Sequence, residues 1–123
     1  MTNDLYFFDS YAIIEVFNGN PLYKNYALCN PIFTKLNIYE VYYYLLRERN
    51  ETTANKFIIH FRNSIKEFNL FTVIKAAKFK LFYKNKKFSM VDCIGYVMAR
   101  NLEIPFLTGD REFEGLPNVE FVR

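Results

Sequence analysis

The sequence has few of the residues that build redox or zinc sites. Among 123 residues there are two cysteines, Cys29 and Cys93, and one histidine, His60. The cysteines lie far apart and neither belongs to a C-x-x-C or Cys/His pattern, so neither a disulfide framework nor a zinc site is supported. We interpret both cysteines as buried small apolar residues and expect no catalytic role for His60.

Long apolar runs are also missing. No stretch approaches the ~18 apolar residues of a membrane span, and the chain does not open on a basic segment followed by an apolar one. With 51% hydrophobic and 24% charged residues, the composition predicts a single soluble domain over residues 1–123, cytoplasmic and without a membrane association. The formal net charge of +3 is compatible with a polyanionic partner but does not require one.

Apolar patterning predicts strands that alternate with helices. The expected strands cover 5–8, 31–34, 104–107 and 119–122 at an edge, with a further short strand possible at 68–71. The expected helices cover 11–17 with Ser10 as cap, 22–27, 35–49, 51–64, 72–84 and 89–101. Such alternation is typical of a three-layer α/β/α fold with a short, mostly parallel central sheet.

The periodicity of two helices also predicts which side chains face the core. These side chains are Ile38, Val41, Tyr42, Leu45 and Leu46 in the first, and Met90, Ile94, Val97 and Met98 in the second.

Four acidic residues occupy comparable positions in this pattern. Asp9 follows the first strand, and Asp110 follows the strand 104–107 after Thr108 and a glycine that permits the sharp exit. In open α/β sheets ligands bind outside the carboxyl ends of the strands. Because a crossover helix begins at that same edge, Glu40 and Asp92, near the starts of their helices, are expected there too.

Each acid also has a purely structural interpretation. Asp92 stands three residues after Ser89, which fits a capping box. Asp110 can cap a short turn over 111–114, and Asp9 can form an Asx-type exit from its strand. Glu40 can be a surface residue paired with Tyr44 or Arg47. Convergence of all four favours a cation, because clustered like charges are tolerated when something compensates them.

An all-oxygen cluster without histidine or cysteine selects Mg²⁺ or Mn²⁺. Ions held by carboxylates that leave coordination positions open suit phosphate chemistry, since they polarise a phosphoryl oxygen and lower the pKa of a bound water. Ser10 and Thr108 are placed to orient the carboxylates or a water from behind.

The acidic motifs resemble those of PIN domains. The matching segments are Asp9-Ser10 after the first strand, Glu40 in Asn-Ile-Tyr-Glu, Asp92 in Ser-Met-Val-Asp, and Leu-Thr-Gly-Asp110 followed by Phe113. Length and compactness are similar to VapC-type toxins, and the resemblance extends over about 6–122. No family motif is recognisable in 51–87.

The resemblance implies a Mg²⁺- or Mn²⁺-dependent endoribonuclease in which Asp9, Glu40, Asp92 and Asp110 are catalytic and bind metal. It further implies an RNA substrate, often a homodimer, and often a cognate antitoxin. Some PIN domains act in RNA processing and some are inactive, so a processing nuclease and a non-catalytic interaction module are the alternatives. Exposed aromatics such as Tyr39, Tyr43 and Tyr44 would serve such a module as a binding surface.

RNA also needs basic residues around a negative site. The candidates are Arg111, beside the proposed site, and Lys84, Lys86 and Lys87 in the lysine-rich segment; a solvated helix face is the other interpretation of the lysines. Two other phosphate-handling folds fit less well, because a receiver domain needs an acidic pair near its first strand and a haloacid-dehalogenase type needs Asp-x-Asp. Asp9-Ser10-Tyr11 has neither.

Overall fold

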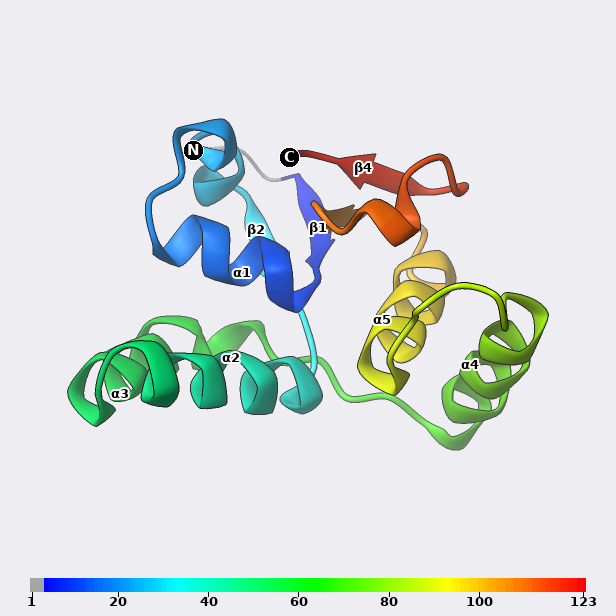
Figure 1. Ribbon diagram of the computed structural model, residues 1–123, viewed down its shortest axis with the longest axis horizontal. Helices are drawn as coiled ribbons and strands as arrows, with labels where there is room; N and C mark the ends of the chain where they lie inside the picture. Colours follow the sequence, from blue (N-terminus) through cyan, green and yellow to red (C-terminus); the bar gives the residue numbers. More distant parts are fainter. Residues whose placement is uncertain (1–3) are drawn as a thin grey trace.

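The computed structural model describes residues 4–123, which build a four-stranded parallel sheet. Its order is β2-β1-β3-β4, with every neighbouring pair parallel. The strands are β1 Leu5–Phe8, β2 Asn30–Ile32, β3 Phe106–Thr108 and β4 Val119–Phe121. The α/β class and the parallel sheet are therefore confirmed, and β4 lies at an edge as predicted (Figure 1).

Within residues 4–123 five α-helices accompany this sheet: α1 Ser10–Phe17, α2 Lys35–Glu48, α3 Glu51–Phe61, α4 Leu70–Phe82 and α5 Met90–Asn101. Consecutive strand side chains point to opposite faces. Phe7 packs beneath Gly95 of α5, where an added Cβ would lie 2.7 Å from the Phe7 ring, whereas Phe8 lines a cavity with Val16 and Phe17 of α1. Helices α1 and α5 therefore cover opposite faces, and α2 and α4 pack outside them (Figure 1).

The order in which the chain adds strands reverses between β1 and β3, which makes this position the topological switch point of the sheet. From β1 the chain runs through α1 to β2 on one side, whereas β3 is followed by β4 on the other side. Phe8 lies beside Leu107 in register, so Asp9 and Thr108 leave the sheet next to each other. Such a switch point is where open parallel sheets bind ligands.

Several element boundaries differ from the sequence predictions. The strand expected at 68–71 is wrong, because Asn69 caps α4 through its side chain, which accepts a hydrogen bond from the Thr72 amide, and the helix begins at Leu70. The cap of α1 is Asp9 rather than Ser10. The segment expected to be a helix over 22–27 forms two 3₁₀ turns, Pro21–Tyr23 and Tyr26–Leu28.

Smaller shifts affect the remaining elements. β2 occupies Asn30–Ile32 and β3 occupies Phe106–Thr108, while the helix expected to reach residue 64 ends at Phe61 and continues as a 3₁₀ turn over Arg62–Ser64. Val41, Leu45, Ile94, Val97 and Met98 are buried as expected. Leu46 and Met90, which were expected to face the core, are 42% and 60% exposed.

None of the helices within residues 4–123 is long and apolar enough to cross a membrane.

Candidate active site at the switch point

Asp9 connects β1 to α1 and is almost completely buried, with 4% of its surface exposed. Its Oδ1 accepts a 2.8 Å hydrogen bond from the Ala12 amide, which caps the helix. Its Oδ2 accepts a hydrogen bond from the Thr108 hydroxyl at the end of β3. The carboxylate is thus held by both strands of the switch point and by the first turn of α1.

Asp110 lies in the turn that leaves β3. Its amide donates to the Thr108 hydroxyl oxygen at 3.0 Å, and its Oδ1 accepts from the Glu112 amide at 3.0 Å. The second bond caps the 3₁₀ turn Arg111–Phe113, as the structural interpretation of Asp110 predicted. One threonine hydroxyl therefore connects the Asp9 carboxylate to the backbone of Asp110.

Gly109 allows the backbone to approach two neighbours closely. A Cβ there would lie 2.2 Å from the Tyr11 ring and 2.6 Å from the Val122 carbonyl oxygen. Among residues 4–123 the glycines with positive φ are Gly19 and Gly115, so Gly109 is not required by a left-handed turn. The sequence prediction placed glycine correctly for the exit, but the physical reason is the narrow space.

Phe113 fixes the end of the same turn in the core. Its side chain is fully buried, and its ring stacks on Phe88 at 4.3 Å between centroids and contacts Phe106 at 4.7 Å. The turn that carries Asp110 is therefore anchored at one end by β3 and at the other by an aromatic cluster.

Asp92 forms the capping box that its spacing predicted. Its Oδ2 accepts from the Ser89 amide at 2.9 Å, and its own amide donates to the Ser89 hydroxyl oxygen at 3.0 Å. Within residues 4–123 its Oδ1 accepts no hydrogen bond in the structure. Capping therefore occupies one oxygen of this half-buried carboxylate and leaves the other available.

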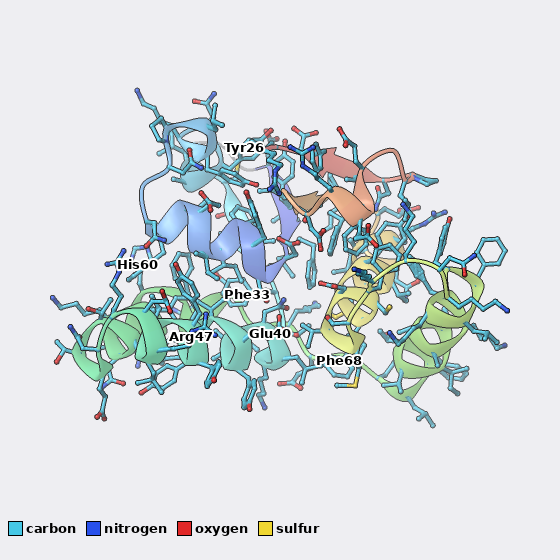
Figure 2. All side chains as sticks on the ribbon, viewed as in Figure 1. Tyr26, Phe33, Glu40, Arg47, His60 and Phe68 are labelled. Carbon is cyan, nitrogen blue, oxygen red and sulfur yellow. The ribbon has the colours of Figure 1, made fainter. Side chains whose placement is uncertain are left out.

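Glu40 lies in the second turn of α2, on the side that faces the start of α1 (Figure 2). Its Oε1 accepts a 2.6 Å hydrogen bond from the Ser10 hydroxyl. The pairing with Tyr44 or Arg47 considered from the sequence is wrong, because Arg47 instead pairs with Glu48 at 3.0 Å. Ser10 and Thr108 thus each donate to one of the four carboxylates.

Asn37 is a buried polar residue that the sequence reasoning missed. Its Nδ2 donates to the Ser10 hydroxyl oxygen at 3.1 Å, and its Oδ1 accepts from the Thr34 amide at 3.0 Å. The signal in the sequence was Thr34-x-x-Asn37, which forms the capping box of α2. That spacing indicates a helix start but does not reveal the contact with Ser10, 27 residues away.

The four carboxylates interact electrostatically. Burial, helped by the negative charges of Asp92 and Asp110, raises the pKa of Asp9 to about 8, against the opposing effect of its two hydrogen bonds. Burial also raises the pKa of Asp92 to about 6, with added repulsion from Asp110 and Glu40. The ion pairs within residues 4–123 are Lys35–Glu67 and Arg47–Glu48, so no basic side chain neutralises this cluster through an ion pair.

The donor chemistry of the cluster fits a hard cation, although the side chains are not yet arranged as a ligand set. In the described part of the chain no three carboxylate, imidazole or thiol groups form a ready-made metal site. Asp92, Asp110 and Glu40 each have one oxygen engaged by Ser89, Glu112 or Ser10. Their second oxygens are available, and the shared negative charge is what a Mg²⁺ or Mn²⁺ ion would compensate.

Two of the predicted basic residues, Arg111 and Lys87, lie beside the turn of Asp110. Arg111 is exposed next to it, and the Lys87 amide donates to Glu112 Oε1 at 2.6 Å, which places the end of the lysine-rich segment against this turn. Lys84 and Lys87 are exposed and Lys86 is half-buried. Arg111 and Lys87 therefore lie next to the Asp110 turn, and Lys84 and Lys86 precede Lys87 in the chain.

The remaining sequence candidates lie elsewhere. His60 is exposed on α3, packs edge-on against Phe61 and lies well away from Glu40 (Figure 2). It lines a cavity of about 530 Å³ between α1 and α3, together with Cys29 and Lys56. Both cysteines are free; Cys93 is buried as predicted, whereas Cys29 is only partly buried.

Comparisons with known proteins identify the fold but no sequence relative. No family model and no curated protein sequence matches the chain. Solved structures match over nearly the whole chain. A chain of a toxin–antitoxin complex from Klebsiella pneumoniae superposes with a TM-score of 0.75 at 18% identity, over 94% of this chain and 95% of that one.

Two further matches come from VapC systems. VapC20 of Mycobacterium tuberculosis, a toxin that cleaves the sarcin–ricin loop, has a TM-score of 0.74 at 14% identity, with 96% of this chain and 99% of that one covered. VapBC2 of Rickettsia felis, bound to a promoter DNA fragment, has a TM-score of 0.71 at 12% identity, with 97% and 99% covered. The chain therefore has a PIN-type fold. Within that class, its fold is that of the VapC toxins.

The raised pKa values predict how pH affects the stability of the metal-free protein. The native state keeps protons on Asp9 and Asp92 that an unfolded carboxyl with a pKa of 3.8 has already released. We therefore expect the unfolding free energy in EDTA to fall as the pH rises through 6 and 8, by about 1.4 kcal/mol per pH unit for each proton involved.

Urea unfolding at a series of pH values from about 5 to about 9 measures this effect. Asp9→Asn should flatten the fall in the upper half of that range, since the amide cannot ionise. Unfolding free energy that increases from about pH 5 to about pH 8, or an unchanged slope in Asp9→Asn, would contradict the assigned pKa shifts.

Proposed function

We propose that this protein is a Mg²⁺- or Mn²⁺-dependent endoribonuclease that hydrolyses RNA phosphodiester bonds. The observation that carries the proposal is the group of Asp9, Glu40, Asp92 and Asp110 at the switch point, coupled through their charges and without a basic partner in an ion pair. The fold shared with VapC20, a toxin that cleaves the sarcin–ricin loop, supports an RNA substrate.

The proposed chemistry assigns Asp9, Glu40, Asp92 and Asp110 as metal ligands. When bound, the ion supplies a polarised phosphoryl oxygen and a bound water of lowered pKa. Thr108 and the Ala12 amide hold Asp9 in one orientation, while Ser10 holds Glu40. The Asp110 turn is fixed by Phe113, which limits movement of its carboxylate relative to Asp9.

The burial of Asp9 also argues against a purely structural role for the cluster. A helix cap is served as well by asparagine, which carries no charge to bury. A carboxylate with a pKa raised to about 8 lowers stability at neutral pH unless a cation compensates it. This favours a catalytic site over the non-catalytic interaction module.

Mutation of single carboxylates tests the catalytic proposal. We expect purified protein to cleave RNA with Mn²⁺ or Mg²⁺ and to lose cleavage in EDTA. Asp9→Asn, Glu40→Gln, Asp92→Asn and Asp110→Asn should each lower the rate by more than about 100-fold, because outer residues around metal sites already contribute 10- to 100-fold. The measurement is the initial rate on a labelled RNA of mixed sequence.

Glu114→Gln is the matched control, because Glu114 is an exposed acid in the same loop as Asp110. Its rate should stay within about twofold of the wild type, since exposed charges contribute little when screened by salt. Cleavage that persists in EDTA, or an unimpaired Asp9→Asn, would show that the nuclease proposal is wrong.

We further propose that RNA crosses the rim formed by Arg111, Lys84, Lys86 and Lys87. Each neutralised phosphate releases counterions and therefore makes binding depend on salt. Arg111→Gln and Lys87→Gln should weaken binding of catalytically inactive Asp9→Asn to RNA and reduce the slope of log K against log salt by about 0.7 for each phosphate that the variant no longer neutralises. Lys24→Gln, an exposed lysine on a separate turn, is the control; an equal effect there would contradict a local rim.

We propose that the chain is the toxin of a toxin–antitoxin pair and forms a homodimer. The outer face of α4 is apolar, with Leu70, Ile74 and Leu81 exposed by 72%, 43% and 71%. Together with Ala77 these residues follow the 4-3-4 spacing of a helix–helix seam, which suits a second copy.

The cavity between α1 and α3 has an apolar floor and Lys56 and His60 at its edge, which suits an acidic, partly apolar antitoxin segment.

Two sets of variants should separate these surfaces. We expect Ile74→Lys with Leu81→Lys to convert a dimer to a monomer that still binds the antitoxin. Ala27→Arg, which narrows the cavity, should leave the dimer intact and lose the antitoxin. Sedimentation measures both, first on the chain alone and then after co-expression with the product of the reading frame immediately upstream. A monomeric wild type would contradict the dimer. A complex that is unaffected by Ala27→Arg would contradict the antitoxin site.

A further inference from the structure

A directed chain of hydrogen bonds connects the start of α2 to Glu40. Its members are Thr34, Asn37 and Ser10, and both Thr34 and Asn37 are nearly inaccessible, with 1% and 2% of their surfaces exposed. The chain crosses from α2 to α1 and returns to α2 at Glu40. It therefore reaches one of the four carboxylates from the buried side.

The first donor in this chain, the Thr34 backbone amide, fixes the direction of every hydrogen bond that follows it. The Thr34 backbone amide can only donate, and it points at Asn37 Oδ1 at 3.0 Å. The opposite atom of the amide group is therefore Nδ2, which donates to Ser10 Oγ at 3.1 Å. Because that oxygen already accepts from Asn37, its own proton is directed to Glu40 Oε1 at 2.6 Å.

We propose that Asn37 is a positioning residue for the catalytic site. By donating to Ser10, it makes the hydroxyl a fixed donor to Glu40 Oε1 and leaves Oε2 to face the other carboxylates. The effect on metal binding rests on the nuclease function proposed above. The orientation of Ser10 does not depend on it, because the hydrogen bonds are present in the metal-free protein.

The alternative is that Asn37 only completes the capping box of α2. Aspartate at 37 would serve the cap equally, since a carboxylate also accepts from the Thr34 amide. It would, however, present an acceptor to Ser10, so the hydroxyl proton would turn to residue 37 and Glu40 would lose its donor. Asn37→Asp therefore separates capping from positioning.

The experiment is a double-mutant cycle on Mn²⁺ affinity, measured by calorimetry without RNA. We expect Ser10→Ala and Asn37→Ala each to lower the affinity 10- to 100-fold, in the range typical of outer residues at metal sites. The double variant should lose no more than the larger single loss, because Asn37 acts through Ser10. Losses that multiply would overturn the proposal.

Two further variants complete the test. Asn50→Ala removes a comparable helix-end hydrogen bond, the 2.8 Å bond from the Thr53 amide, far from the site; it should lower the melting temperature without changing Mn²⁺ affinity. Asn37→Asp should remain folded by circular dichroism and bind Mn²⁺ more weakly, although an added negative charge alone would strengthen cation binding. Stronger binding in Asn37→Asp, or an equal loss in Asn50→Ala, would overturn the positioning role.

Crystal structures of metal-free Asn37→Ala and Asn37→Asp make the outcome independent of the proposed nuclease function. We expect the bond from Ser10 to Glu40 to be lost in Asn37→Asp, where the hydroxyl donates to residue 37 instead. In Asn37→Ala no competing acceptor is present, so we expect the Ser10 hydroxyl to lose its single orientation without gaining a new partner. If Ser10 and Glu40 keep the wild-type contact in Asn37→Asp, the proposal is overturned. If instead the wild type binds no Mn²⁺ while Ser10 reorients in the variants, the nuclease proposal fails and the positioning role of Asn37 stands.

Discussion

The structure of the site depends on one buried acidic group, the carboxyl of Asp9. It lies where β1 ends and α1 begins, and it is hydrogen-bonded by the Ala12 amide and by Thr108 at the end of β3. These bonds stabilise the ionised form, but burial and the neighbouring acids outweigh them and raise the pKa of Asp9 to about 8. The elements around it therefore converge on a point that needs positive charge.

Helix starts supply part of that positive potential. Asp9 caps α1, Asp92 belongs to the first turn of α5, and Asp110 caps the 3₁₀ turn Arg111–Phe113. The unpaired amides at the start of an α-helix carry partial positive charge, which favours a carboxylate there. Capping and ligand roles are compatible for the same residue, since a carboxylate that gives one oxygen to an amide still has another for a cation.

A rigid aromatic cluster supports the geometry of the Asp110 turn. Phe88, Phe106 and Phe113 are all buried, and Tyr96 of α5 stacks on Phe113 with ring centroids 5.7 Å apart. The cluster connects α5, β3 and the turn after β3, so Asp92 and Asp110 are fixed relative to each other through packing rather than through a direct bond. Two carboxylates held in this way can be preorganised for a cation despite their mutual repulsion.

The local features of this protein could be read from its sequence, because they depend on neighbours within a few residues. The alternation of strands and helices, the capping box of Asp92 and the cap formed by Asp110 all follow from short-range spacing. The strand expected at 68–71 failed because the capping strength of Asn69 outweighed an apolar pattern too short to distinguish strand from helix. The four acids were predicted to share one edge from topology alone.

Only the tertiary structure decided the contacts between distant segments. Ser10 meets Glu40 across 30 residues, and Thr108 meets Asp9 across 99. The need for glycine at 109 comes from the Tyr11 ring and the Val122 carbonyl, neither of which is near in sequence. The direction of the hydrogen bonds through Asn37 likewise requires α1 and α2 to be packed together. Short-range spacing determined which residues begin each helix or strand. Packing determined which of those residues are hydrogen-bonded to one another and which carboxylates interact through their charges.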